Sequence, residues 1–342
     1  MKKKAIITGI FGQDGVYLSK FLIKKNYKII GIYNKVNSNQ FLLSNEILKK
    51  NIILFKSNIT NFNSLKRIIN DSNPDEIYNL AATSSVAESF KNPKKMMKIN
   101  VNGLLNILEI LRFKKKKISL YQASSSEMFG HNNHNLLNEK TVFNPISPYG
   151  ISKVSAHCLV KFYREAYNIE CCSGILFNHE SSLRNKNFVT KKIITNLCKI
   201  YNGKNIVIKL GNLYSKRDWG YAPDYVEAMW KMLQLKKKTD FVIGTGKNYD
   251  LKTFINLTCS YLNLNIKWIG QKSNEKCINL KTNKIIIEID KRLYRPLDIN
   301  FQKCDVRKAK KQLKWIAKTN LNKLIENLCD SELKCNSKNY HI

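Results

Sequence analysis

The fold is decided near the start of the chain, by the stretch Lys4-Ala-Ile-Ile-Thr-Gly-Ile-Phe-Gly-Gln-Asp-Gly15. Its first five residues form a short apolar run, which indicates a buried strand, and a helical pattern follows at Val16–Lys25. Glycines at a strand-to-helix turn let the backbone approach a pyrophosphate, which the helix N-terminus then stabilises. The spacing is G-x-x-G-x-x-G and not G-x-G-x-x-G. The placement of the glycines between a strand and a helix is therefore more informative than their spacing.

Strand-like and helical segments alternate after this turn. Apolar runs that predict strands lie at residues 28–33, 52–55, 76–80, 118–123 and 170–176. Helical patterns lie between them at residues 61–71, 95–112 and 149 to about 167. Alternation on this scale predicts an α/β fold, a Rossmann-like doubly wound parallel sheet that binds ligands at the carboxyl ends of its strands.

The pattern changes after Leu176, where polar loops separate shorter elements. We expect a strand at residues 241–244 and helices at 188–201, 225–235 (capped by Asp224), 251–262 and, last, 305–313. No repeat or low-complexity linker separates the halves, so we expect a smaller, interwoven C-terminal α/β lobe. We place residues 1–177 in one domain and 178–342 mainly in the other, with about 205–245 returning to the first sheet.

The composition is that of a globular protein. Apolar residues make up 43% of the chain, and no apolar run approaches the length of about 20 residues that spans a bilayer. The basic N-terminus is followed only by the short apolar stretch Ala5–Ile10, without a signal-peptide cleavage site. The nine cysteines are scattered without a C-x-x-C pair, which predicts reduced thiols and no metal site. We therefore expect a cytoplasmic protein with no membrane partner.

The formal net charge of +34 allows two interpretations. One is a nucleic-acid or anionic-surface partner, and the other is the lysine-rich composition that a strongly AT-rich coding sequence produces. Lysines are spread along the chain, including Lys49–Lys50, Lys114–Lys117 and Lys236–Lys238, without the aromatic–basic interleaving that stacks bases. We therefore expect no nucleic-acid partner, and a non-catalytic nucleic-acid-binding protein is a remote alternative.

Two motifs carry candidate chemistry: Ser124-Ser-Ser-Glu127 and Tyr149-Gly-Ile-Ser-Lys153. A tyrosine and a lysine four residues apart lie on one face of a helix, about one turn from each other. A lysine ammonium beside a phenol favours the phenolate, so the tyrosine can exchange a proton near neutral pH. Hydroxyls and a carboxylate arriving from a strand end would complete a site that suits oxidation of a sugar alcohol beside a nicotinamide.

Other positions predict how a dinucleotide would be held. An acid after the second strand would bind the ribose 2′-hydroxyl of NAD, but this chain has Asn34-Lys35, which favours NADP and leaves NAD as the alternative. Asn58 and Ile59 stand where an adenine contact is expected, and the small Ala81-Ala82 would let the cofactor pass over a strand end.

Two arginines from separated loops, Arg217 and Arg295, could clamp a diphosphate, because guanidinium groups bind phosphates bidentately.

The order of glycine turn, serine-rich strand end and Tyr-x-x-x-Lys resembles the short-chain dehydrogenase/reductase superfamily. The whole chain resembles its extended branch, specifically the GDP-mannose 4,6-dehydratase family. The matching segments are Ile7–Leu18, Asn79–Ala82, Tyr121–Glu127, Ser147–Lys153, Tyr163–Tyr167, Gly174–Ser181, Phe188–Thr190, Lys216–Gly220, Asp224–Trp230 and Tyr294–Pro296.

The resemblance implies a redox-neutral dehydration. Tyr149, kept as phenolate by Lys153, would take the C4 hydroxyl proton while the C4 hydride passes to NADP. Glu127 would remove the C5 proton and assist loss of the C6 hydroxyl as water, before hydride returns to C6. Ser125, where the family usually has threonine, would hydrogen-bond the C4 oxygen.

The resemblance also implies a set of binding residues and partners. The implied cofactor-binding residues are Gly9, Phe11, Gly12, Gln13, Asp14, Asn34, Lys35, Asn58, Ile59, Leu80, Ala81, Ala82, Tyr149, Lys153 and His179. The implied substrate-binding residues are Ser84, Ser85, Glu127, Asn178, Val189, Lys192, Arg217 and Arg295. The first domain would bind NADP and the second a GDP-sugar, in a homo-oligomer that is a dimer or a tetramer.

Departures from the family pattern surround the sugar. Thr83 and Ser85 replace the usual Gln and His, and Leu183, Tyr221 and Pro223 replace an Arg, a His and a Lys. We therefore expect GDP-mannose or a related GDP-manno-sugar, such as a GDP-heptose, as substrate. A nucleotide-sugar epimerase, reductase or decarboxylase on the same fold is the alternative, and Glu127 argues against simple epimerases and reductases because elimination demands a base at C5.

Overall fold

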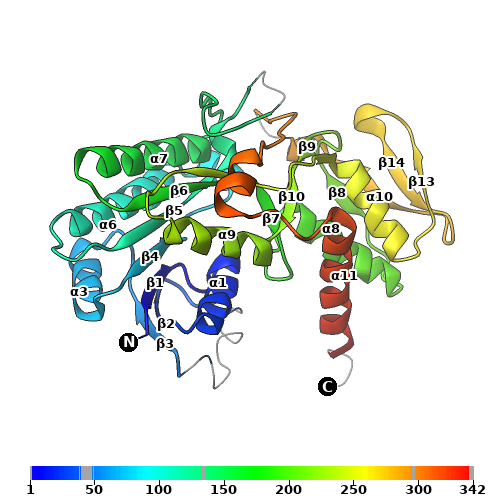
Figure 1. The fold of residues 1–342 in the computed structure, drawn as a ribbon. Helices are drawn as coiled ribbons and strands as arrows, with labels where there is room; N and C mark the ends of the chain where they lie inside the picture. The colour runs from blue at the N-terminus through cyan, green and yellow to red at the C-terminus, as the bar shows by residue number, and fades with distance from the viewer. Residues whose placement is uncertain are drawn as a thin grey trace. The chain divides into compact units, whose positions relative to one another are not determined.

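The structure is a computed structural model that describes residues 2–37, 39, 48, 50–132, 136–294 and 297–338 (Figure 1). Its backbone divides into two compact units. The first comprises Met1–Phe177, Ala222–Gly244 and Cys304–Ile316, and the second comprises Asn178–Tyr221, Thr245–Lys303 and Ala317–Ile342. The chain therefore passes from one unit to the other several times.

The first unit is built on a seven-stranded sheet with the order β11-β6-β5-β4-β1-β2-β3, in which each neighbouring pair is parallel. Its strands are β1 (Lys4–Thr8), β2 (Lys28–Tyr33), β3 (Ile52–Lys56), β4 (Glu76–Asn79), β5 (Ser119–Ser125), β6 (Cys171–Leu176) and β11 (Phe241–Ile243). The order reverses between β1 and β4, as in a doubly wound sheet. The predicted fold class is confirmed.

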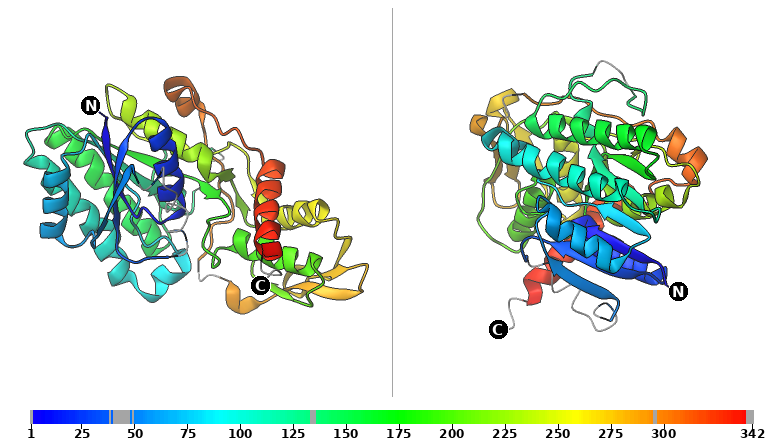
Figure 2. Two further views of the ribbon diagram at one scale, coloured as in Figure 1. Left: turned by 90° about the horizontal axis from the view of Figure 1, so that it is seen from below. Right: turned by 90° about the vertical axis from the view of Figure 1, so that its left-hand side faces the viewer.

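Helices cover both faces of this sheet (Figure 2). The helices α3 (Phe62–Ser72), α6 (Gly103–Arg112) and α7 (Pro148–Ala166) share one hydrophobic core with β1, β2, β4 and β5. The helices α1 (Gln13–Lys24) and α9 (Ala222–Gln234) pack side by side, and α9 contacts β5, β6 and β11. Shorter elements are α4 (Val86–Lys91), α5 (Pro93–Met97), the π-helices η2 (Lys98–Asn102) and η6 (Ala309–Leu313), and the 3-10 turn η3 (Ser126–Met128).

The second unit contains a four-stranded sheet and two short pairs of strands. The sheet has the order β13-β14-β15-β8, with β13 (Ile266–Ile269), β14 (Lys276–Asn279), β15 (Lys284–Ile289) and β8 (Ile208–Leu210). The pairs are β7 (Asn178–Glu180) with β10 (Trp219–Tyr221), and β9 (Lys216–Arg217) with β12 (Tyr249–Asp250). Helices α8 (Val189–Tyr201), α10 (Leu251–Tyr261) and α11 (Leu321–Lys338) share its core.

Several expectations for the second half were wrong or incomplete. The antiparallel strands β13–β15 were not foreseen, and the last helix is α11 rather than the pattern at 305–313, of which residues 309–313 form a π-helix. Asp224 lies inside the first turn of α9, which begins three residues earlier than expected. Of the segment 205–245, α9 and β11 belong to the first unit, whereas β8, β9 and β10 belong to the second.

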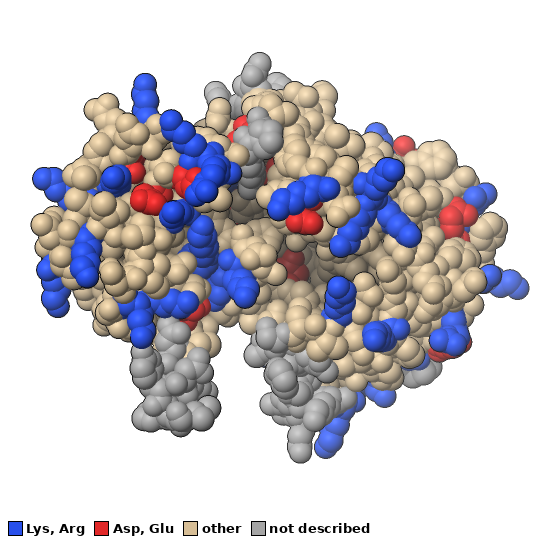
Figure 3. Space-filling model, turned by 180° about the vertical axis from the view of Figure 1, so that it is seen from behind, with Lys and Arg blue, Asp and Glu red and all other residues tan. Residues whose placement is uncertain are grey.

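Basic side chains are scattered over one face of the molecule. Figure 3 shows lysines and arginines across this face, with few acidic residues among them and no single basic stripe. This distribution is what a lysine-rich composition produces, whereas a nucleic-acid track requires gathered charge. Within the described residues, none of the helices has the length and apolarity needed to cross a bilayer.

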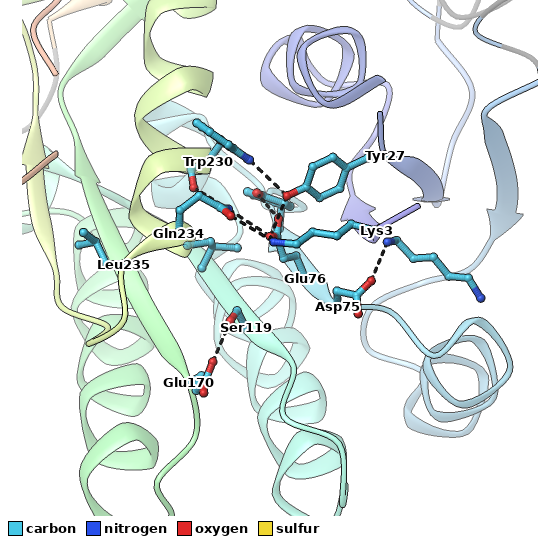
Figure 4. Close-up of polar contacts among 12 residues, drawn as sticks. Lys3, Tyr27, Asp75, Glu76, Ser119, Glu170, Trp230, Gln234 and Leu235 are labelled. Atoms are coloured by element: carbon cyan, nitrogen blue, oxygen red, sulfur yellow. Dashed lines mark hydrogen bonds and ion pairs between the residues drawn. The ribbon is translucent and has the colours of Figure 1, made fainter. Parts of the chain in front are cut away.

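A buried carboxylate organises the amino end of the sheet. Glu76, only 3% exposed at the start of β4, accepts hydrogen bonds from the Tyr27 hydroxyl (2.9 Å) and the Gln234 amide (3.1 Å) on one oxygen. Its other oxygen accepts from the Tyr78 hydroxyl (2.7 Å). Figure 4 shows Tyr27, Gln234 and the Lys3 ammonium converging on this carboxylate from different elements. Glu76 therefore ties α9, distant in sequence, to the central strands.

Replacement of Glu76 by alanine should strongly destabilise the first unit. The variant leaves the buried Tyr27 and Tyr78 hydroxyls without their acceptor, so we expect the free energy of unfolding to fall by about 3 kcal/mol. Glu170→Ala at the same end of the sheet is the matched control, because Glu170 is half-buried and accepts a bond from Ser119 (3.0 Å). We expect a loss of about 1 kcal/mol there in urea denaturation; equal losses in both variants would contradict the assignment.

Candidate active site

The glycine turn at the end of β1 is closed against the end of β4. Gly9 has a φ of +69°, and a Cβ at this position would stand 3.0 Å from the backbone of Ala81. The Gly12 N–H donates to the Gly9 carbonyl (2.8 Å), and Gln13 and Asp14 then open helix α1. The structure thus brings together two predicted cofactor segments that are some seventy residues apart, and it leaves their contact face without side-chain bulk.

The loop after β2 lies beside the same turn. The Phe11 ring packs against the Tyr33 ring with centroids 4.9 Å apart, and the Phe11 carbonyl accepts a bond from the Asn37 side-chain amide (3.1 Å). Asn34 and Lys35 follow β2 directly and are exposed. A positive rather than a negative side chain therefore stands where a ribose contact is expected.

The remaining predicted cofactor residues of this unit differ in exposure. Asn58 is exposed, and its side-chain oxygen accepts a bond from the Thr60 N–H (3.0 Å). The Ile59 side chain is buried in the core shared with α6. Leu80, Ala81 and Ala82 are half-buried after β4.

The serine-rich motif forms the end of β5 and a single turn beyond it. The Ser125 hydroxyl accepts a hydrogen bond from the Glu127 N–H (3.2 Å), which starts the turn η3. Glu127 is buried, and Ser125 is half-buried. This local bond sets the hydroxyl and the carboxylate residue on the same short turn at the carboxyl edge of the sheet.

Tyr149 and Lys153 lie in the first two turns of α7, which Ser147 caps by accepting a bond from the Gly150 N–H (3.0 Å). The Lys153 ammonium lies 5.7 Å from the centroid of the Tyr149 ring and donates to the Ala123 carbonyl of β5 (2.8 Å). Lys153 is 3% exposed, and burial lowers its pKa to about 8. The ammonium therefore loses its proton more readily than a surface lysine.

A close backbone contact joins these two motifs. A Cβ at Gly150 would stand 2.7 Å from the Glu127 carbonyl oxygen, so a glycine is required where α7 meets η3. The four predicted catalytic residues, Ser125, Glu127, Tyr149 and Lys153, are thereby gathered at one end of β5. Their chemical roles stay predictions.

Asn100 is a site residue that sequence reasoning missed. It is buried in the π-helix η2, donates to the Ser152 hydroxyl of α7 (2.9 Å), and exchanges hydrogen bonds with the Thr83 backbone (3.0 and 3.2 Å). An asparagine inside an apolar helical pattern was the available signal, because buried amides need partners. Asn100 holds the loop that carries Ser84, which is exposed, and Ser85, which caps α4.

The other predicted binding residues belong to the second unit. Asn178 and His179 lie on β7, Val189 and Lys192 open α8, and Arg217 lies on β9. Arg295 lies outside the described residues.

Two of these residues have partners within the second unit. The Lys192 ammonium donates to the Lys209 carbonyl (2.7 Å), and burial lowers its pKa. Arg217 is buried and forms an ion pair with Asp298 (3.1 Å).

Glu180 orders the start of α8. Its buried carboxylate accepts from the Thr190 hydroxyl (2.8 Å) and pairs with the Arg184 guanidinium (3.1 Å). The run Asn178-His-Glu-Ser181 thus combines two predicted ligand residues with the acid that positions the neighbouring helix.

A cavity of about 580 Å³ lies elsewhere, at the amino ends of β5 and β6, and is lined by Lys117, Arg164 and Lys236–Lys238 among others. Arg164 is bound bidentately by Asp240 (2.9 and 2.7 Å), and the Lys238 ammonium caps α9 through two carbonyls. This cavity is at the opposite edge of the sheet from Ser125 and takes no part in the candidate site. The described residues contain no cluster of three metal-binding side chains.

Known proteins are similar to this chain over nearly its whole length. The family model for GDP-mannose 4,6 dehydratase matches residues 6–328. The GDP-mannose 4,6 dehydratases of Dictyostelium discoideum and Homo sapiens are each 38% identical, over 97% and 96% of this chain and 96% and 91% of theirs. The dTDP-glucose 4,6-dehydratase of Bacillus anthracis, solved with NAD, has a TM-score of 0.80 at 20% identity, covering 98% of both chains.

Replacement of Gly150 by alanine should separate the two candidate catalytic motifs. The added methyl group would stand 2.7 Å from the Glu127 carbonyl oxygen, so α7 must shift away from η3. A displacement of about 1 Å lowers turnover by about 100-fold, and we expect that loss in steady-state kinetics. Cys158→Ala, at an exposed position of the same helix, is the control. Wild-type turnover in Gly150→Ala would show that the contact is not needed.

Proposed function

The chain belongs to the GDP-mannose 4,6-dehydratase family, a family of hydro-lyases, and we propose that it converts GDP-mannose or a related GDP-manno-sugar into the 4-keto-6-deoxy sugar and water. The observation that carries this proposal is the contact between α7 and η3. This backbone contact supports a role for an acid, Glu127, beside the Tyr149–Lys153 pair. An enzyme that only oxidises and re-reduces C4 needs the Tyr149–Lys153 pair but does not need Glu127.

Tyr149 and Lys153 act at the sugar C4 in this proposal. Tyr149 takes the proton of the C4 hydroxyl, and the ammonium of Lys153 favours the phenolate that receives it. The Ser125 hydroxyl, half-buried at the end of β5, donates a hydrogen bond to the C4 oxygen as it becomes a carbonyl. A bound nicotinamide would supply the hydride acceptor for C4 and, later, the hydride donor for C6.

Glu127 acts at the neighbouring carbons. The C4 ketone makes the C5 proton acidic, and the Glu127 carboxylate takes that proton. The C6–O bond then breaks, and the hydroxyl leaves with a proton as water. A hydride at C6, which a bound nicotinamide would supply, and a solvent-derived proton at C5 complete the reaction, so the product has the composition of the starting sugar less one water. The buried position of Glu127 keeps the bulk solvent from competing for these steps.

The residues present fit a dinucleotide cofactor. Gly9 packs against the backbone of Ala81, and Gly12 is the N-cap of α1, whose N-terminus would favour a pyrophosphate. Lys35 is exposed directly after β2, and the chain has no acid at positions 34–37. We therefore infer NADP rather than NAD, because a carboxylate that would repel a 2′-phosphate is absent from these positions.

The substrate in this proposal is a GDP-sugar, held in part by residues of the second unit. Arg217 and Lys192 carry positive charge suited to a diphosphate. Thr83 and Ser85 lie in the loop that Asn100 holds, and the replacement of larger family residues there admits a bulkier sugar such as a GDP-manno-heptose. Mass spectrometry of the products from both sugars decides between them.

The protein is proposed to be a cytoplasmic homo-oligomer. Phe162 on α7 is 52% exposed and Phe113, just after α6, is 77% exposed, with Ile151 also exposed on α7. Apolar side chains gathered on neighbouring helices favour a second copy of the chain as their cover. A monomer in sedimentation velocity at micromolar concentration would contradict this part.

Charge reversal at Lys35 should weaken NADP binding selectively. We expect Lys35→Glu to raise the dissociation constant of NADP+ by at least about 10-fold and that of NAD+ by less than about threefold, because only the former has a 2′-phosphate. Lys28→Glu, at the exposed opposite end of β2, is the control. Isothermal titration calorimetry measures the constants of both cofactors for the wild type and the two variants, and equal weakening for both cofactors would refute an NADP contact.

Glu127→Gln should separate oxidation from dehydration. We expect water loss to fall by about 1,000-fold, since the amide cannot take the C5 proton, while a 4-keto sugar still forms and can be trapped with borodeuteride. In deuterium oxide the wild-type product should gain one deuterium at C5, and the variant's sugar should not. Glu165→Gln, an exposed acid on α7, is the control. Undiminished dehydration would favour an epimerase-like or decarboxylase-like use of the site.

A further inference from the structure

A row of four buried polar side chains crosses the middle of the parallel sheet. Thr8 on β1 is in register with Asn79 on β4, Asn79 with Gln122 on β5, and Gln122 with Ser173 on β6. All four, here called the polar row, are at most 3% exposed. Uncharged polar groups at this depth cost free energy unless they are hydrogen-bonded, so their arrangement requires an explanation.

Three members of the polar row form one directed chain of hydrogen bonds. The Thr8 hydroxyl donates to the Asn79 amide oxygen (2.7 Å), and the Asn79 amide N–H donates to the Gln122 amide oxygen (2.7 Å). The Gln122 amide N–H donates to the Ala123 carbonyl (3.0 Å). The orientations of the Asn79 and Gln122 amides are therefore fixed, because the oxygen of each accepts a hydrogen bond and the nitrogen of each donates one.

The two ends of this chain of bonds are at the candidate site. The Ala123 carbonyl also accepts the hydrogen bond of the Lys153 ammonium (2.8 Å). At the other end, the Thr8 hydroxyl oxygen accepts from the backbone N–H groups of Leu80 (3.1 Å) and Ala81 (3.0 Å). The chain of bonds therefore runs from the loop beside the glycine turn to the anchor of the catalytic lysine.

We propose that Gln122 is a positioning residue for Lys153, and that the polar row couples the Lys153 anchor to the Leu80–Ala81 loop. A carbonyl oxygen has two lone pairs, and the Gln122 amide occupies one of them, which leaves a defined direction for the lysine. The Lys153 ammonium is buried, and the hydrogen bond to this carbonyl (2.8 Å) therefore stabilises its charged form. The roles of Lys153 and of the loop rest on the proposed function, whereas the coupling rests on the bonds themselves.

Ser173 supplies an internal control. It is in the same row and fully buried, but its hydroxyl has no hydrogen-bond partner within the described residues. Ser173→Ala therefore removes a buried hydroxyl of the row without breaking the directed chain. Gln122→Met has nearly the shape of glutamine and removes both the acceptor for Asn79 and the donor to Ala123.

The kinetic test compares Gln122→Met with Ser173→Ala. We expect Gln122→Met to lower kcat by about 10-fold or more with KM for the GDP-sugar within about twofold, because the lysine and not the substrate is displaced. The alkaline decline of activity should begin at lower pH than in the wild type, since loss of a well-placed acceptor disfavours the ammonium. A stability loss with unchanged kcat and pH profile would make the row merely structural and overturn the positioning role.

A second measurement is independent of turnover. The rate of amide hydrogen exchange at Leu80 and Ala81 in the cofactor-free chain should rise by about 10-fold in Thr8→Val and in Gln122→Met. In Thr8→Ser, which keeps the hydroxyl, the exchange rate should stay at the wild-type value. Exchange unaffected by Gln122→Met would overturn the coupling even in an active enzyme. If the wild type turns over no GDP-sugar but the exchange pattern is as expected, the proposed function fails while the coupling stands.

Discussion

The structure depends on one close contact, between the first turn of α7 and the turn after β5. Gly150 allows the helix backbone to approach the Glu127 carbonyl, and the Lys153 ammonium bonds to the Ala123 carbonyl two residues before the end of β5. A strand end and a helix from separate parts of the chain are thereby held together by backbone atoms. Because backbone contacts do not depend on flexible side chains, the carboxylate, phenol and lysine are presented from rigid elements.

Buried polar groups hold the sheet at both of its ends. At the amino end, the Glu76 carboxylate accepts hydrogen bonds from Tyr27, which precedes β2, from Tyr78 on β4 and from Gln234 on α9. Near the carboxyl end, Thr8, Asn79 and Gln122 bond to one another across three strands. Such networks are costly when incomplete, so they favour a single register of the strands over its alternatives. The register in turn decides which side chains reach the site edge.

The large positive charge has no comparable structural role. Two lysine runs approach one cavity at the amino ends of β5 and β6, but the innermost cations there are already bound by Asp240 or by the carbonyls at the end of α9. On the face that Figure 3 shows, the basic residues are scattered. This cavity and the candidate site are therefore at opposite edges of the same sheet.

Much of the fold and of the site could be predicted from the sequence, because the signals were local. The strand β2 ends where the apolar run ends, and Tyr149 and Lys153 share a helical face by their spacing alone. Helix α11 was not predicted, although its signal was local: Leu321, Leu324, Ile325 and Leu328 recur at helical spacing. Asn100 and the Thr8–Asn79–Gln122 row were decided only by tertiary structure. Their partners lie 52, 71 and 43 residues away in the chain, and only the strand register and helix packing bring a buried amide to the acceptor that makes it stable.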